Sequence, residues 1–218
     1  MIVRIGKAEI AALVESTSGP PAAERDEMAV PSYLHWNPAI RWLMWRRYET
    51  IAMLAEIRPD TTVLEFGCGL GLFLPTLAAR AGRVTAIDLH PEYAKRLAEN
   101  RRLPVRFVGD LSQVEDGSID LIIAADVMEH LDDPAAVARS FCQKLARDGR
   151  LIVSGPTETW LYRLGRVAAG FRGKGGYHRF DVYSLVAMIR QSGFSPGRSE
   201  SVPLPPPFAL FKIAEFRR

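Results

Sequence analysis

The 218-residue sequence has only two cysteines, Cys68 and Cys142, and lacks an uninterrupted apolar run long enough for a membrane span. Two thiols cannot build a disulfide framework or a four-cysteine zinc site, so a reducing, cytoplasmic compartment is expected. Charged side chains interrupt the apolar stretches of residues 1–18, which disfavours a secretory signal. The hydrophobic share of 48% and the charged share of 24% are those of a globular chain.

The chain also lacks a large excess of charge of either sign. It has 28 basic and 25 acidic residues, which leave a net charge of +3. The basic residues gather mildly at Arg41, Arg46 and Arg47 and again between 163 and 179. Nucleic-acid binders usually carry a larger excess with interleaved aromatic residues. These clusters therefore favour a solvated surface, and nucleic acid is not an expected partner.

Short apolar runs alternate with helical patterns through the middle of the chain. The runs lie at 61–66, 83–87, 105–108, 119–124 and 150–154. Continuous apolar runs are typical of strands that helices cover on both faces, which predicts a doubly wound parallel α/β sheet. Two further strands are expected at 195–202 and 208–216, and apolar residues spaced by three and four predict a helix over 38–57.

Four of the predicted strands end in a carboxylate. These residues are Glu65, Asp88, Asp110 and Asp126. In sheets of this kind ligands bind beyond the carboxyl ends of the strands. The sequence therefore predicts a ligand site along that edge.

Glycines at every second position follow the first predicted strand, at Gly67, Gly69 and Gly71. Such a loop lets backbone approach a ligand closely, and a helix N-terminus follows it. A dinucleotide fingerprint needs its third glycine at position 72, where this chain has Leu72. The spacing is thus less suited to a pyrophosphate.

Two of the acidic residues have alternative interpretations. Asp88 lies 23 positions after Glu65, where an acid can accept hydrogen bonds from ribose hydroxyls, but it could instead cap the next helix. Asp110 could accept from an exocyclic amine while Leu111 covers a ring, although alone this would be an ordinary turn. The joint pattern with the glycines favours the ligand-binding interpretation.

Taken in order, these motifs resemble those of the class I S-adenosylmethionine-dependent methyltransferases, and within them the broad small-molecule group called type 11. The motifs are Glu65-x-Gly67-x-Gly69-x-Gly71, Asp88, Gly109-Asp110 and Asp120-x5-Asp126-x2-Glu129-His130-Leu131. The resemblance implies a Rossmann-like, doubly wound seven-stranded sheet, mostly parallel with an antiparallel last strand. It also implies S-adenosylmethionine as cofactor and S-adenosylhomocysteine as product.

The resemblance assigns a role to each matching residue. The implied cofactor-binding residues are Glu65, Gly67, Cys68, Gly69, Gly71, Asp88, Leu89, Asp110, Leu111 and Asp126. Glu65 would orient the methionine amino end, Asp88 would hold the ribose hydroxyls, and Asp110 would accept from the adenine amine. Members of the family often have Asp where this chain has Glu65. The longer side chain of Glu65 should shift the position of the carboxyl group without abolishing its role.

The candidate catalytic residues are His130 and His178. His130 follows the fourth predicted strand and could act as general base, or it could simply belong to a helix-opening turn. Asp126, Glu129, His130 and His178 also resemble the divalent-metal site of some methyltransferases that act on vicinal hydroxyls. A metal is nevertheless not expected, because Asp126 would be committed to the cofactor.

The regions outside the motifs should select the acceptor. Residues 1–30 are expected to be a peripheral segment with a linker, and 31–218 a single methyltransferase domain. Within that domain, 31–58 would form a helical lid and 155–193 an insert on the substrate side. Trp42 and Trp45, three apart on one predicted helix, indicate a core or interface stripe.

The expected reaction is direct methyl transfer to a small-molecule or lipid-linked acceptor, with oxygen as the nucleophile. Residues 157–174 mix aromatic, apolar and basic side chains, which suits a peripheral contact with the inner face of a membrane and equally a lid or a dimer contact. The alternatives are an NAD-type nucleotide-binding oxidoreductase, which Leu72 argues against, and a non-catalytic protein that binds S-adenosylmethionine. The oligomeric state stays open.

Overall fold

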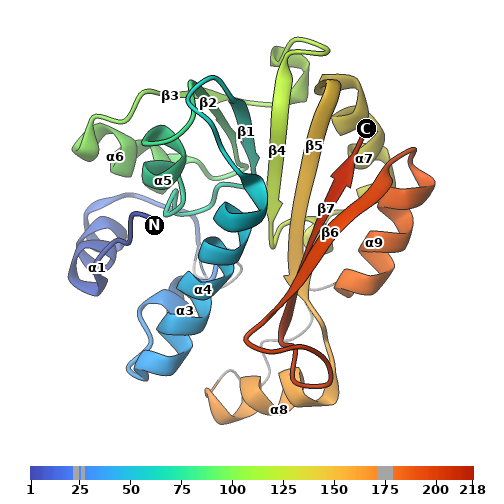
Figure 1. Cartoon of the computed structure of the whole chain (residues 1–218). Coiled ribbons are helices and arrows are strands. Elements are labelled where there is room, and N and C mark those ends of the chain that lie inside the picture. Colours follow the sequence, from blue (N-terminus) through green and yellow to red (C-terminus); the bar gives the residue numbers. More distant parts are fainter. Residues whose placement is uncertain (22–24, 26–27, 171–178) are drawn as a thin grey trace.

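The computed structural model describes residues 1–21, 25, 28–170 and 179–218, and its centre is one seven-stranded sheet (Figure 1). The strand order is β3-β2-β1-β4-β5-β7-β6. The strands are β1 (Thr62–Phe66), β2 (Arg83–Ile87), β3 (Val105–Val108), β4 (Ile119–Ala125), β5 (Leu145–Pro156), β6 (Ser195–Val202) and β7 (Phe211–Arg217). Strand β7 runs antiparallel to β5 and β6, and the other pairs are parallel. The predicted fold is confirmed.

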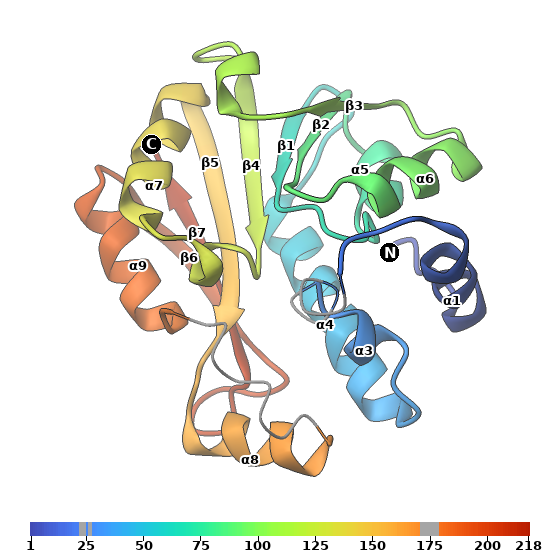
Figure 2. The same ribbon diagram turned by 180° about the vertical axis from the view of Figure 1, so that it is seen from behind.

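Helices cover both faces of this sheet, as Figures 1 and 2 show from opposite sides. The helices are α1 (Lys7–Ser16), α3 (Val30–Tyr33), α4 (Pro38–Ala55), α5 (Leu74–Ala78), α6 (Glu92–Arg101), α7 (Pro134–Lys144), α8 (Trp160–Ala168) and α9 (Val182–Gln191), with short 3-10 turns η1 (Leu111–Gln113) and η2 (Met128–His130).

Alternate strand residues contribute to the two cores. Leu121 and Ile123 of β4 pack on the side of α4 and α5, whereas Ile122 and Ala124 pack on the side of α7 and α9.

One predicted boundary was wrong. The strand expected from Arg150 begins at Leu145, and its register against β4 is irregular between the pairs Ile119–Leu145 and Leu121–Arg150. The helix after the glycine loop begins at Leu74, where the Leu74 amide donates to the Gly71 carbonyl at 3.0 Å.

The carboxyl ends of β4 and β5 point toward a cluster of peripheral elements. Figures 1 and 2 place α3, the first turns of α4, helix α8 and the connection between β6 and β7 at that end. Helix α1 lies to one side, where Ile10 and Leu13 are buried against Tyr93 and Leu97 of α6. The Arg101 side chain donates to the Glu9 carboxylate at 2.7 and 2.8 Å and ties the same two helices together.

Helix α4 is fixed to the sheet by two arginines and one buried glutamate. Arg150 and Arg198 donate to the α4 carbonyls of Leu54 and Ala55, at distances between 2.6 and 3.3 Å. Both guanidinium groups also bind the Glu215 carboxylate of β7, at 2.9 and 2.8 Å. Burial alone would raise the pKa of Glu215, but the two arginines outweigh it and the pKa is lowered. The C-terminal carbonyls of α4 are therefore held by cations, as a helix C-terminus favours.

Replacing Glu215 by alanine should lower the free energy of unfolding by about 3 kcal/mol, because two guanidinium groups lose their buried counter-charge. Urea denaturation at pH 7 measures this, with Glu200→Ala as control, since Glu200 lies exposed on the neighbouring strand β6. A carboxylate with a lowered pKa stabilises the fold above its ordinary value of 4.5. The difference between wild type and Glu215→Ala should therefore shrink as the pH falls below that value, and equal losses in both variants would contradict the interpretation.

Candidate functional site

The glycine loop after β1 is pinned to the end of β2. The amides of Gly67 and Cys68 both donate to the Ile87 carbonyl, at 2.8 and 3.1 Å. Gly67, Gly69 and Gly71 have φ angles of 76°, 52° and 73°, a region that side chains disfavour. A Cβ at Gly69 would meet nothing within 4 Å, so the backbone there borders open space.

Asp88, directly after β2, holds this loop from the other side. Its carboxylate accepts from the Gly69 amide at 2.6 Å and from the His90 amide at 2.8 Å. The side chain thus ties the glycine loop to its own turn, whereas the N-cap position of α6 is Pro91. Leu89 beside it is 91% exposed at the same edge of the sheet.

Asp110, after β3, caps the short turn η1. Its carboxylate accepts from the Ser112 amide at 2.7 Å, and the hydrogen bonds from Ser112 lower the pKa of this carboxyl. Leu111, the next residue, packs partly buried against the core beside α7. The predicted acidic positions thus lie at the carboxyl ends of neighbouring strands.

Glu65, in β1, has a buried carboxyl group just before the glycine loop. Its Oε2 atom has no hydrogen-bond partner among the described residues. Burial, reinforced by the Asp88 carboxylate, raises the pKa of Glu65 to about 8. A buried carboxyl oxygen without a partner is suited to a ligand with a hydrogen-bond donor or a cation.

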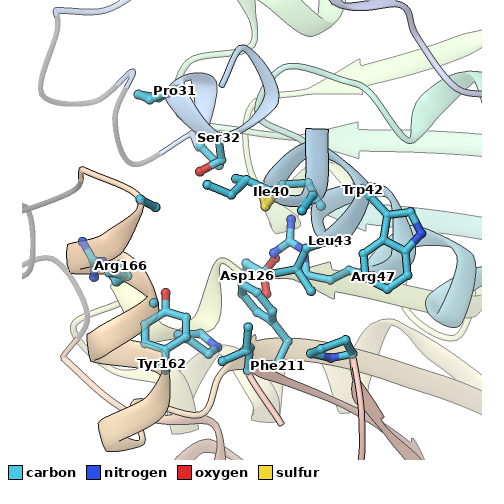
Figure 3. A pocket seen from close by; sticks show the side chains of 18 of the residues that line it. Pro31, Ser32, Ile40, Trp42, Leu43, Arg47, Asp126, Tyr162, Arg166 and Phe211 are labelled. Carbon is cyan, nitrogen blue, oxygen red and sulfur yellow. The ribbon is translucent and has the colours of Figure 1, made fainter. Parts of the chain in front are cut away.

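A cavity of about 430 Å³ opens next to this region, between α4 and α8 (Figure 3). Most of its lining is apolar, with polar groups from Ser32, Arg47, Asp126, Glu129 and Arg166. The lining residues are Ala29, Pro31, Ser32, Ala39, Ile40, Trp42, Leu43, Met44, Arg47, Asp126, Glu129, His130, Pro156, Tyr162, Gly165, Arg166, Ala169, Pro203, Leu210 and Phe211. A volume of this size suits a small organic molecule.

Arg47 forms the floor of the cavity and was not predicted as a site residue. It is 4% exposed, so the solvated surface expected for it is wrong. Its guanidinium pairs with the Asp126 carboxylate and stacks 4.7 Å from the Phe211 ring centroid (Figure 3). The signal was present in the sequence, because Arg47 lies three residues after Met44 and four before Ile51 on the buried face of α4.

Asp126, which follows β4, has a φ of 53° and also accepts from the Ser154 hydroxyl at 2.9 Å. This carboxylate is therefore occupied by protein partners. Trp42, expected in a core or interface stripe with Trp45, lines the cavity and is half exposed, whereas Trp45 is buried.

Glu129 and His130 both line the cavity, from the turn η2. Burial raises the pKa of Glu129 to about 8. His178, the fourth member of the metal alternative, lies outside the described residues. Within the described ranges, no group of three or more His, Cys, Asp or Glu side chains is arranged to hold a metal ion.

Residues 41–196 match the model of a family described as a methyltransferase domain. The chain belongs to this family. The match covers most of the sheet, the glycine loop and the wall of the cavity formed by α4 and α8. It supports S-adenosylmethionine-dependent methyl transfer over the dinucleotide-dependent oxidoreductase and over the non-catalytic binding protein.

Known proteins of similar sequence and fold agree with this assignment. A "Ubiquinone biosynthesis O-methyltransferase" from Xanthomonas euvesicatoria pv. vesicatoria (strain 85-10) is 33% identical over 163 residues, which cover 67% of each chain. Other curated relatives of that description match over less than two thirds of their own length.

Among solved structures, the N-methyltransferase NodS from Bradyrhizobium japonicum WM9 with S-adenosyl-l-homocysteine has a TM-score of 0.65 at 21% identity, covering 90% of this chain and 96% of its own. The Burkholderia thailandensis 1,6-didemethyltoxoflavin-N1-methyltransferase has a TM-score of 0.62 at 19% identity, covering 100% and 92%. At these identities the likeness concerns the fold.

The residues present fit S-adenosylmethionine, which supplies an activated methyl group on a sulfonium. The open space beside Gly69 leaves room for a ligand along the loop, and the partnerless Oε2 of Glu65 suits an ammonium group. Within the described part of the chain, no helix is both long and apolar enough to cross a bilayer.

The two glycines of the loop should respond differently to alanine. Both substitutions force a side chain into a positive φ, at a cost of about 1 kcal/mol. At Gly71 the new Cβ would also lie 2.8 Å from the Ala94 Cα, whereas at Gly69 it would meet open space. Gly71→Ala should therefore lose about 1–3 kcal/mol more unfolding free energy than Gly69→Ala. Urea denaturation of both variants checks this, and equal losses would contradict the close approach of loop and α6.

Proposed function

We propose that the protein transfers the methyl group of S-adenosylmethionine to a hydroxyl oxygen of a small apolar acceptor held in the cavity between α4 and α8. The observation that carries this proposal is the position of the cavity. It is apolar, about 430 Å³ in volume, and bounded by Asp126 and Glu129 at the same edge of the sheet as the glycine loop. An acceptor bound there lies next to a ligand bound along the loop, as direct displacement requires.

The cofactor roles in this proposal follow the predicted positions. Glu65 receives the amino end of the cofactor, and Gly67 to Gly71 let it pass. Asp88 accepts from the ribose hydroxyls, with Leu89 on the adenine. Asp110 and Leu111 lie at the adenine end, and Cys68 is a small buried residue within the glycine loop. The supporting facts are the shared edge of these residues and the unsatisfied oxygen of Glu65.

The proposed acceptor is a hydroxylated aromatic compound with apolar substituents. Ile40, Leu43 and Phe211 offer apolar walls, and most of the cavity lining is apolar. The name of the Xanthomonas relative points to oxygen as the methylated atom in that protein. The lipid-linked form of the acceptor belongs to the same proposal, because an apolar tail suits such walls.

Residues 31–58 and 155–193 act in this proposal as lid and substrate-side insert. His35 links them, because its Nε2 atom lies 3.0 Å from the Ala169 carbonyl at the end of α8. Its Nδ1 atom accepts from the Asn37 amide at 3.0 Å, so the neutral Nε2–H tautomer suits both contacts. The catalytic roles of His130 and His178 stay predictions.

Binding of S-adenosylhomocysteine tests the cofactor half of the proposal. Asp88→Ala should weaken binding at least tenfold, or about 1.4 kcal/mol, because it removes an acceptor and frees the Gly69 amide. Titration calorimetry of the folded proteins measures the change. Asp120→Ala is the matched control, since Asp120 accepts from the Thr62 amide at 2.8 Å at the opposite end of the sheet. Equal affinity in wild type and Asp88→Ala, or no binding by wild type, would overturn the proposal.

We further propose that α8 makes a peripheral contact with the inner face of a membrane. Trp160, Leu164 and Val167 are 72%, 56% and 42% exposed and recur at helical spacing, which forms one apolar stripe. Arg163 and Arg166 accompany the stripe and suit anionic headgroups. The remainder of the predicted 157–174 contact, from residue 171 onward, lies outside the described residues.

Replacing both Trp160 and Leu164 by serine should reduce sedimentation with phosphatidylglycerol-containing vesicles by about tenfold, because apolar area available to the bilayer is lost. Met53→Ser is the control, because Met53 is also exposed but lies on the C-terminal half of α4. Retained binding of S-adenosylhomocysteine verifies folding of each variant. Equal sedimentation of all three proteins, or none for wild type, would exclude the contact.

A further inference from the structure

Arg166 of helix α8 is a half-buried cation in the wall of the acceptor cavity. Its guanidinium lies 5.9 Å from the Tyr162 ring centroid. Among the described residues, the carboxylates of Asp126 and Glu158 pair with Arg47 and Arg163, and none pairs with Arg166. Resting on the proposed O-methyl transfer, we infer that Arg166 selects acceptors that carry a carboxylate in addition to the methylated hydroxyl.

Arg47, the other arginine of the cavity wall, is already engaged by the protein. It pairs with Asp126, stacks on Phe211 and is only 4% exposed. An acceptor carboxylate could take its place as counter-charge only by displacing Asp126. Arg166 is therefore the lining arginine that can form a new ion pair without breaking an existing one.

Two arginines on α8, three residues apart, differ in their surroundings. The Arg163 side chain is 74% exposed, lies 3.8 Å from the Glu158 carboxylate and does not line the cavity. Arg166 lies beside Tyr162, and both line the wall that faces α4 (Figure 3). The helix thus gives one arginine to the surface and the other to the cavity.

The surroundings of Arg166 suit a carboxylate. A guanidinium can bind a carboxylate through two parallel N–H donors, which is stronger and more directional than a bond between neutral groups. The mostly apolar lining screens this attraction less than open water does. Figure 3 also shows the Ser32 hydroxyl of α3 directed into the cavity, where it offers a further donor.

The distribution of charge around the cavity gives the acceptor an orientation. At the carboxyl end of β4, the Asp126 charge is balanced by Arg47, and Glu129 adds a second acidic group. That end offers no unpaired cation to a carboxylate, whereas the α8 wall does. An acceptor bound by Arg166 therefore directs its other end, with the hydroxyl, toward the carboxyl ends of the strands. The chemical class that fits is a hydroxylated aromatic acid.

An anionic lipid headgroup would offer Arg166 the same chemistry, because α8 also carries the exposed stripe. The inference assigns the acceptor carboxylate to Arg166 on the ground that this side chain lines the cavity. Binding measured without vesicles isolates the acceptor. Sedimentation with phosphatidylglycerol-containing vesicles, measured separately, reports the headgroup.

The test uses 3-(3,4-dihydroxyphenyl)propanoate and its uncharged amide, which differ in charge but little in shape. Titration calorimetry at pH 7 gives the Kd of each for the protein saturated with S-adenosylhomocysteine. Wild type should bind the carboxylate about tenfold more tightly than the amide, because a charge-assisted pair at a half-buried site adds to the shared contacts. Arg166→Gln should remove this preference while its Kd for the amide stays within about twofold. Arg166→Lys, which keeps the charge, should retain most of the preference.

Arg147→Gln is the control, because Arg147 is exposed near the start of β5, at the end of the sheet away from the cavity. Its preference should equal that of wild type. Wild type with similar affinity for both probes, or with none for either, would overturn the inference. So would an Arg166→Gln variant that weakens both probes equally, or that loses only vesicle sedimentation. Failure of wild type to bind S-adenosylhomocysteine would instead overturn the proposed function itself.

Discussion

The buried ion pair between Arg47 and Asp126 joins helix α4 to the carboxyl end of strand β4, and the cavity between α4 and α8 is organised around it. Its guanidinium also stacks on Phe211 and lies 3.4 Å from the Tyr33 hydroxyl, so it connects α3, α4, β4 and β7. A buried pair of this kind contributes less to net stability than to a defined geometry, because desolvation offsets much of the attraction. Here the pair fixes the positions of Arg47, Asp126 and Phe211, which all line the cavity.

The ion pair engages only one of the carboxyl groups at this edge. Burial raises the pKa of Glu65 and of Glu129 to about 8, and the Oε2 atom of Glu65 and both carboxyl oxygens of Glu129 have no hydrogen-bond partner among the described residues. In an ordinary core such groups would be replaced by apolar residues, since unpaired buried carboxyls destabilise the fold. Buried carboxyl groups with perturbed pKa values are typical of sites that ligands complete.

Local patterns in the sequence predict the sheet and the glycine loop well. The conformations of β1, of β4 and of the glycines at 67, 69 and 71 follow from residues that are close together in the sequence. The partners of Glu215 and Asp126 could not be predicted, because Arg198, Arg150 and Arg47 meet them only after the chain has folded. The burial of Arg47 was accessible from its helical spacing, but its charge favoured the opposite interpretation. The absence of hydrogen-bond partners for the Glu129 carboxyl group among the described residues depends on how the cavity packs, and it could not be predicted from the sequence.

The position of α8 relates the acceptor cavity to the surface. Tyr162 and Arg166 of this helix line the cavity (Figure 3), as does Gly165, whereas Trp160 and Leu164 are exposed. The Tyr162 ring packs edge-on against Phe211, at 5.7 Å between centroids, and so connects α8 to β7 and to the Arg47 pair. If the exposed stripe lies on a bilayer, an apolar acceptor can pass from the lipid into the cavity with little exposure of its tail to water. The cost of extracting such a tail, about 0.8 kcal/mol for each CH₂ group, would then be largely avoided, which favours lipid-linked acceptors over water-soluble ones.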